Sequence, residues 1–224
     1  MSGGAVMEFS GVSFGFDPGR PLFSGLSLEL ARGTFYLVTG PSGSGKSTFL
    51  RLINRLEEPS GGTVFFNGRP LSDYPPPELR RSILFIQQTP VVVDGTVREN
   101  LLLPFSFKHN RGLAKPGDEV LRKELEQMLM GNVSLDDSAR NLSVGQMQRL
   151  CLTRGLLLSP EMLLLDEPVS ALDEESARIV ERRAEGLCSG GGLTVVMVSH
   201  RRFETGGIRP IVLRIEKGRI EVPA

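Results

Sequence analysis

One glycine-rich segment has the residue types and the spacing that bind phosphate groups. Residues 40–47 fit the pattern G-x-x-x-x-G-K-[ST], after an apolar run that ends at Thr39 and before an amphipathic helix. Glycines let backbone N–H groups curl around phosphates, and the helix adds the positive end of its dipole. The alternative is a glycine-rich turn without a ligand. The residues predicted to bind phosphate are Gly40, Pro41, Ser42, Gly43, Ser44, Gly45, Lys46, Ser47 and Thr48.

Three side chains of this phosphate loop, residues 40–48, have separate predicted roles. Lys46 is expected to reach the β- and γ-phosphates of a nucleotide, because an ammonium group is a strong phosphate ligand. Ser47 is expected to bind a Mg²⁺ ion, and Thr48 a further phosphate oxygen.

A pair of acids farther along the chain could complete this chemistry. The apolar run Met162 to Leu165 leads directly into Asp166 and Glu167. A carboxylate at the carboxyl end of a buried strand lies beside a phosphate loop, where it can hold Mg²⁺. We therefore expect Asp166 to bind the metal and Glu167 to polarise an attacking water as a general base. The alternative is a solvated strand end.

The segment from Leu142 to Gln146 is predicted to begin a helix. Ser143 can cap the helix, and Gln146 stands three residues later, where a capping box places a glutamine. Taken alone, these features indicate no more than an ordinary capped helix.

The sequence of this signature segment, Leu142-Ser-Val-Gly-Gln146, resembles the LSGGQ signature of ABC ATPases, and Gln148-Arg149-Leu150 follows as in that family. The resemblance extends over nearly the whole chain. It implies that Ser143, Gly145 and Gln146 bind the γ-phosphate of ATP held by an opposite subunit. Val144 departs from the glycine of the commonest form, whereas the family's phosphate contacts at Ser143 and Gly145 are intact.

Further positions are assigned by the same resemblance. Gln88, in Gln88-Thr-Pro, aligns with the Q-loop glutamine that contacts the metal and the reacting phosphate, and Gln87 is the rival. Ser170-Ala-Leu-Asp173 is similar to the D-loop, which places Asp173 at the nucleotide. His200 follows an apolar strand as the family's switch histidine does.

Phe16 falls where the family places an aromatic ring that stacks on adenine. It also continues the alternation of Val12 and Phe14, so a place in the core is the alternative.

The fold class indicated is α/β: a P-loop NTPase core with an N-terminal antiparallel β subdomain and an inserted α-helical subdomain. Apolar runs at 83–86, 162–165 and 194–198 are typical of strands buried on both faces of a parallel sheet. Apolar residues between Phe49 and Leu56 predict a helix that Pro59 stops. The expected single domain divides into a β subdomain with the first part of the core (1–90), a helical subdomain (91–158) and the remainder of the core (159–224).

Composition restricts the class of protein. The 26 basic and 26 acidic residues cancel, which argues against nucleic acid as a partner. No apolar run is long enough to cross a bilayer, and the first residues do not resemble a signal peptide. We therefore expect a cytoplasmic protein held at the inner face of the cell membrane by a separate permease.

The resemblance implies an ATPase that uses ATP and Mg²⁺, works as a head-to-tail homodimer with two composite sites, and powers that integral membrane permease. The segment 88–105 is similar to compact bacterial exporters, including an iron-export type. The alternative is a non-transport ABC ATPase that signals through a membrane scaffold.

Overall fold

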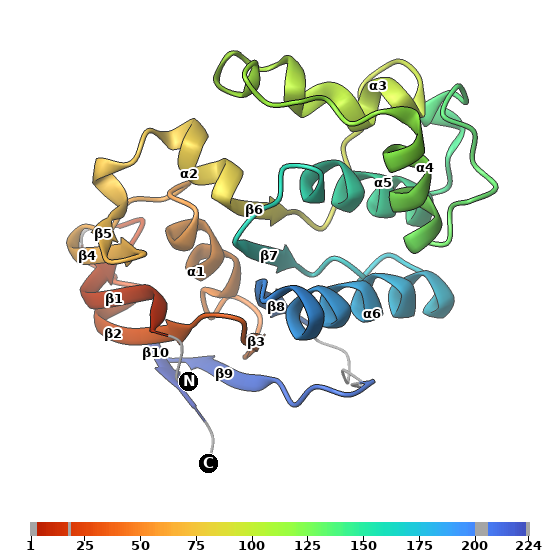
Figure 1. The fold of residues 1–224 in the computed structure, drawn as a ribbon. Coiled ribbons are helices and arrows are strands. Elements are labelled where there is room, and N and C mark those ends of the chain that lie inside the picture. The colour runs from red at the N-terminus through yellow and green to blue at the C-terminus, as the bar shows by residue number, and fades with distance from the viewer. Residues whose placement is uncertain (1–3, 18, 200–205, 223–224) are drawn as a thin grey trace.

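An antiparallel sheet forms one side of the protein, which a computed structural model describes over residues 4–17, 19–199 and 206–222 (Figure 1). Alternate residues of its strands are buried, among them Phe9 and Phe66, so one face of the sheet covers the core. The expected antiparallel strands and the turn at Asn67-Gly68 are confirmed. The strand order is β2-β1-β4-β5, with β1 Ala5–Phe14, β2 Phe23–Ala31, β4 Gly61–Phe66 and β5 Arg69–Pro70.

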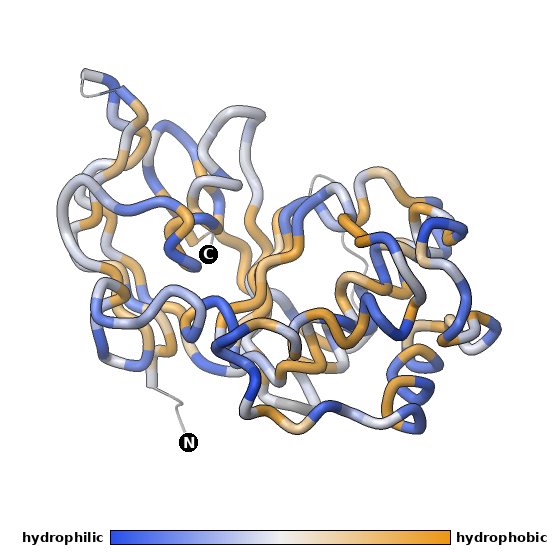
Figure 2. Tube along the Cα trace, turned by 90° about the horizontal axis from the view of Figure 1, so that it is seen from above, coloured by the Kyte–Doolittle hydropathy of each residue, from blue (hydrophilic) through white to orange (hydrophobic). Residues whose placement is uncertain are grey.

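A second sheet, of six strands, passes through the centre of the molecule, where Figure 2 shows hydrophobic stretches. In β7, Met162 and Leu164 face one apolar cluster, while Leu163 and Leu165 face the other. These strands are therefore buried on both faces, as predicted. The order is β10-β9-β3-β8-β7-β6, parallel except for the β9–β10 hairpin, with β3 Phe35–Thr39, β6 Ile83–Ile86, β7 Met162–Asp166, β8 Thr194–Val198, β9 Ile211–Glu216 and β10 Arg219–Glu221.

The helix after the phosphate loop is shorter than predicted. Helix α1, Lys46–Ile53, ends well before Pro59, so the prediction of its end was wrong. Arg55 has a left-handed φ of 55°, and the N–H groups of Leu56 and Glu57 both donate to the carbonyl oxygen of Arg51, at 2.8 and 3.1 Å. These bonds close the helix end before the proline. Leu56, which the periodicity assigned to the buried face, is 43% exposed.

A lobe of helices lies between β6 and β7 in the chain, as predicted, and stands beside the sheet in Figure 1. It contains α3 Val97–Leu102, α4 Asp118–Gln127 and α5 Val144–Leu156. Helix α6, Glu174–Gly191, follows β7 and precedes β8 in the sequence. It covers one face of the six-stranded sheet (Figure 1). The remaining elements are α2 Pro76–Ser82 and the 3-10 turns η1 Leu71–Asp73, η2 Leu103–Ser106, η3 Lys108–Asn110 and η4 Ala139–Asn141.

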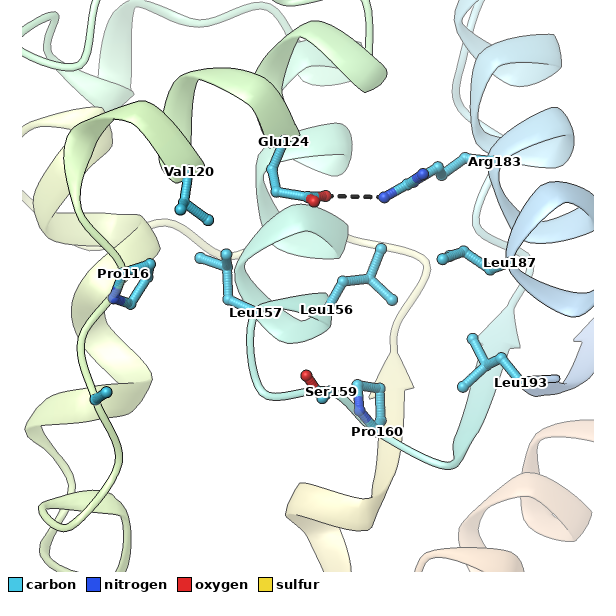
Figure 3. A pocket seen from close by; sticks show the side chains of 11 residues that line it. Pro116, Val120, Glu124, Leu156, Leu157, Ser159, Pro160, Arg183, Leu187 and Leu193 are labelled. Atoms are coloured by element: carbon cyan, nitrogen blue, oxygen red, sulfur yellow. Dashed lines mark hydrogen bonds and ion pairs between the residues drawn. The ribbon is translucent and has the colours of Figure 1, made fainter. Parts of the chain in front are cut away.

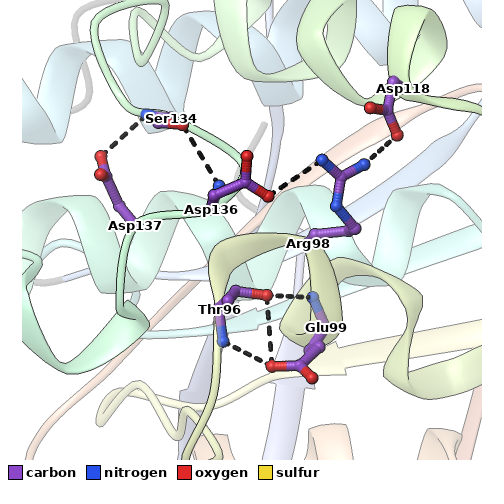
Figure 4. A network of polar contacts seen from close by, with 7 residues as sticks. All are labelled: Thr96, Arg98, Glu99, Asp118, Ser134, Asp136 and Asp137. Atoms are coloured by element: carbon purple, nitrogen blue, oxygen red, sulfur yellow. Dashed lines mark hydrogen bonds and ion pairs between the residues drawn. The ribbon is translucent and has the colours of Figure 1, made fainter.

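Polar contacts fix the shape of the lobe (Figure 4). Thr96 and Glu99 form a capping box at the start of α3. In the same first turn, Arg98 pairs with Asp118 at the start of α4 and with Asp136, whose carboxylate lies 3.1 Å from the guanidinium. A single arginine thus joins three segments of the lobe.

The lobe meets the core at an ion pair between α4 and α6. The carboxylate of Glu124 lies 2.8 Å from the guanidinium of Arg183, above a cavity of about 380 Å³ (Figure 3). Leu156, Leu157 and Leu187 line the cavity. The cavity therefore lies where α4, α5 and α6 meet.

Candidate functional site

The phosphate loop connects β3 to α1 and requires glycine at defined positions. Gly40 has a φ of +145°, and a β carbon there would lie 2.2 Å from the carbonyl oxygen of Ile215. Gly45, with a φ of 101°, precedes α1 and supplies no side-chain cap. The first-turn N–H groups of α1 are consequently left for an anionic ligand.

The side chain of Lys46 lies inside the curled loop. It is 6% exposed, and its Nζ donates to the carbonyl oxygens of Gly40, at 3.1 Å, and Pro41, at 2.9 Å. The buried hydroxyl of Ser44 has no hydrogen-bond partner among the described residues. A buried cation and an unsatisfied hydroxyl within one loop fit a ligand rich in anionic oxygens.

The phosphate loop and the acidic pair meet as predicted. Ser47 Oγ donates to Asp166 Oδ1 at 3.0 Å, across 119 positions of sequence. Burial raises the pKa of the Asp166 carboxyl, against the opposing effect of the hydrogen bond from Ser47. A half-buried carboxylate beside a hydroxyl is a suitable pair of oxygen ligands for Mg²⁺, which also takes oxygens from substrate phosphates. The described residues hold no cluster of three His, Cys, Asp or Glu side chains that could bind a metal alone.

Glu167 lies in a turn with unusual backbone geometry. Its φ is 49°, a left-handed value that a non-glycine residue seldom adopts, and its N–H donates to the carbonyl oxygen of Val198 at 3.2 Å. Ser170 closes the turn, because its hydroxyl donates to the carbonyl oxygen of Glu167 at 3.0 Å. Such strain is typical of functional sites, where surrounding contacts hold it in place.

The structure distinguishes Gln88 from its rival. Gln88 Nε2 donates to Ser170 Oγ at 2.9 Å, so this amide lies at the turn that follows Glu167. Gln87 contributes its backbone carbonyl to a contact with α5 instead, accepting from Gln148 at 3.1 Å. The geometry favours Gln88 as the glutamine of the site. The sequence indicated Ser170 only as the first D-loop residue, because a contact across 82 positions leaves no local pattern.

The signature segment forms the capped helix start that its sequence predicts. The Ser143 hydroxyl accepts from the N–H of Gln146 at 3.2 Å, and Gln146 Oε1 accepts from the N–H of Ser143 at 2.9 Å. Val144 is 52% exposed, so the departure from glycine places its side chain in solvent. Gly145 is buried, and a β carbon there would lie 2.7 Å from Ser176 Oγ. Close packing against α6 is thus a second reason for this glycine.

Asp173 caps α6 beside the signature segment. It accepts from the N–H of Ser176 at 2.8 Å, and this hydrogen bond holds the pKa of its carboxyl below the usual range. The predicted D-loop acid therefore has a structural role at a helix start. A direct contact between Asp173 and the nucleotide stays a prediction.

Phe16 is not a core residue, so the alternative of a buried ring was wrong. It is 66% exposed and contacts buried Phe14 edge to face, with ring centroids 5.1 Å apart. Its loop leads to Leu22, whose side chain lies against Gly45 of the phosphate loop. The exposed ring, six residues before Leu22 in the chain, is accessible to a planar ligand.

His200 lies outside the described residues. The strand before it, β8, ends at Val198, which pairs with Asp166 of β7. The chain thus leaves β8 at the carboxyl end of the parallel strands, where Asp166 and Glu167 also lie. Within the ranges described here, none of the helices is long and apolar enough to cross a membrane.

Comparison with known proteins identifies the family. The family described as ABC transporter matches residues 23–170. ABC transporter I family member 17 of Arabidopsis thaliana is 38% identical over 204 residues, covering 91% of this chain and 76% of that protein. The spermidine/putrescine import ATP-binding protein of Oleidesulfovibrio alaskensis is 34% identical over 218 residues, covering 96% of this chain and 57% of the relative. In ABC multidrug transporter E of Aspergillus fumigatus, the match spans only 16% of the relative.

Solved structures show the same fold. CbiO1 from Clostridium perfringens, part of the ABC transporter complex cbiONQ, matches 98% of this chain with a TM-score of 0.79 and 22% identity, over 88% of that chain. A bacterial Atm1-family ABC exporter with ATP bound matches 99% of this chain with a TM-score of 0.80 and 24% identity, over 39% of that chain. The predicted fold class is confirmed, whereas the narrower prediction of an iron exporter stays a prediction. This chain belongs to the ABC transporter family and carries its ATP-binding domain.

Proposed function

We propose that this chain hydrolyses ATP to drive a separate integral membrane permease, working as a head-to-tail homodimer. The observation that carries the proposal is the contact between Ser47 and Asp166 at 3.0 Å, which joins the phosphate loop to the acidic pair. Both groups are oxygen ligands at the place where a nucleotide's β- and γ-phosphates would lie.

The residues of the site divide the reaction between them. The loop N–H groups and Lys46 bind the phosphates, while Ser47 and Asp166 would hold Mg²⁺, which neutralises phosphate charge when bound. Glu167 orients a water and accepts its proton as the water oxygen attacks the γ-phosphorus. The bond from that phosphorus to the oxygen of ADP breaks, and ADP leaves with the bonding electrons. Gln88 and His200 are proposed to contact the water and the γ-phosphate.

The second half of each site is proposed to come from another copy of the chain. The signature segment begins α5 in the lobe, whereas the phosphate loop begins α1 in the core (Figure 1). Its exposed Ser143 sits at a helix N-terminus, a position that favours an anion. ATP bound by one copy would therefore complete its coordination at the signature segment of the other.

A surface after Gln88 supports the proposed membrane partner. Val91 is 63% exposed and Val93 38%, and Phe107 in the same lobe is 54% exposed. Exposed apolar side chains that gather on a surface are typical of an interaction site, and Val91 and Val93 lie two positions apart in the chain. A permease bound there would hold the chain at the inner face of the membrane.

Phosphate release tests the proposed activity directly. The purified chain is expected to release phosphate from ATP when Mg²⁺ is present and to stop when the metal is chelated. A chain that binds ATP with Mg²⁺ and releases no phosphate, either alone or with its membrane partner, would contradict the proposal.

Replacing Phe16 with alanine is expected to weaken ATP binding about tenfold, because base–aromatic stacking is worth about 1–3 kcal/mol. Tripolyphosphate, which lacks the base, should bind the variant as it binds the unmodified chain. The thermal midpoint should change little, since the ring is 66% exposed. The matched control is Phe107→Ala, at another exposed phenylalanine. Equal losses for ATP and tripolyphosphate would argue against stacking.

A further inference from the structure

Helix α5 holds the backbone on both sides of Gln88. Gln148 Nε2 donates to the carbonyl oxygen of Gln87 at 3.1 Å. Two turns farther along the helix, Arg154 Nη2 donates to the carbonyl oxygen of Val91 at 2.9 Å. The segment that contains Gln88 is thus fastened at both ends to the helix that begins with the signature segment.

Packing alone does not explain a glutamine at position 148. Its side chain is 1% exposed, and its Oε1 has no hydrogen-bond partner among the described residues. Burying an amide with one group unpaired costs free energy that an apolar side chain of similar size would avoid. The bond to Gln87 is the interaction that distinguishes this amide from such a side chain.

The same helix lies directly on the strand that leads to Gln88. A β carbon at Gly155 would lie 2.4 Å from the side chain of Leu84 in β6, so α5 approaches this strand closely near its C-terminal end. Cys151 adds a weak hydrogen bond, its Sγ lying 3.4 Å from the carbonyl oxygen of Val91. Helix α5 and the chain that leaves β6 therefore form one continuous contact, from Gly155 to Gln148.

We propose that Gln148 and Arg154 are positioning residues for Gln88. A displacement of α5, produced when its signature segment meets a nucleotide, would move the two carbonyls that flank Gln88. The Gln88 amide contacts Ser170 in the turn after Glu167, so its position would change relative to the reacting phosphate. This inference rests on the proposed function. It names the contacts that transmit a displacement of α5 to Gln88 within one copy of the chain.

The first test replaces Gln148 with methionine, which keeps the side-chain length and removes the donor. We expect kcat for ATP hydrolysis to fall about tenfold, because small misplacements of a positioned group lower rates strongly. The KM for ATP should stay unchanged, since no group of the phosphate loop is altered. The control is Gln127→Met on α4, an exposed position, which should leave both constants unchanged.

A double-mutant cycle shows whether Gln148 acts through Gln88. In a Gln88→Ala background, Gln148→Met should cost less than about twofold, because the group that it positions is already gone. A full tenfold loss in both backgrounds, or a loss confined to KM, would overturn the proposal.

If Gln148→Met lowers the thermal midpoint strongly, Arg154→Met provides the same test at the other end of the segment, with exposed Arg122→Met as its control. The expected result is again a loss in kcat that disappears in the Gln88→Ala background, and additive losses would overturn the proposal. An unmodified chain without ATPase activity would instead contradict the proposed function itself. The two failures are therefore distinguishable.

Discussion

Replacing Lys46 with alanine is expected to weaken ATP binding about 10²–10⁴-fold and to abolish measurable hydrolysis. Hydrogen bonds to charged groups are worth about 1.5–3 kcal/mol each, and the ammonium can make two of them to the β- and γ-phosphates. The fold should survive, because Lys46 lies outside both apolar clusters and its Nζ donates to the loop carbonyls of Gly40 and Pro41.

The measurement is a titration with ATP and Mg²⁺, accompanied by circular dichroism to establish that the variant is folded. Lys123→Ala, at an exposed position of α4, is the matched control and should bind ATP normally. A folded Lys46→Ala protein with the ATPase activity of the unmodified chain would refute the assignment of the phosphate loop.

Replacing Glu167 with glutamine is expected to reduce hydrolysis about 10²–10⁴-fold, the usual contribution of a positioned general base. ATP binding should be retained or strengthened, because the change removes a negative charge beside the γ-phosphate. Glutamine matches the shape of glutamate, so the substitution adds no strain to the left-handed backbone at this position, whose φ is 49°. A loss of hydrolysis is then a chemical effect and not a folding effect.

Single-turnover hydrolysis and equilibrium binding, measured on the same preparation, separate these two effects. Glu8→Gln, at an exposed position of β1, is the control for the loss of one carboxylate. Normal hydrolysis by Glu167→Gln would show that another residue acts as the general base. A parallel loss of ATP binding would indicate that the substitution disturbs the phosphate loop.

Local patterns were sufficient to predict most of the secondary structure. The strands β6 and β8 coincide with the runs 83–86 and 194–198. A strand buried on both faces is apolar along nearly its whole length, so its ends can be recognised in the sequence. The capping box at Ser143 was equally visible, since its two partners are three residues apart. The end of α1 could not be predicted in this way. Leu56 continues the apolar period, although the backbone has already left the helical conformation at Arg55.

Contacts between distant segments could not be derived from the sequence alone. The Ser47–Asp166 bond was expected only because two recognised motifs were assumed to meet. The choice between Gln87 and Gln88 depended on which of two adjacent amides faces Ser170, which is set by the exit of the chain from β6. Likewise, the buried environment of Gly145 arises from α6, a separate helix whose approach no pattern near Gly145 announces.

The central claim is that each ATP is bound between two copies of the chain, and the mass of Glu167→Gln in solution tests it most directly. Light scattering should give the mass of one chain without nucleotide and twice that mass with ATP and Mg²⁺. Adding Ser143→Arg should restore the mass of one chain, because a bulky cation would replace the cap that meets the opposite phosphate. A dimer that persists in the double variant, or a single-chain mass for Glu167→Gln saturated with ATP, would contradict the account.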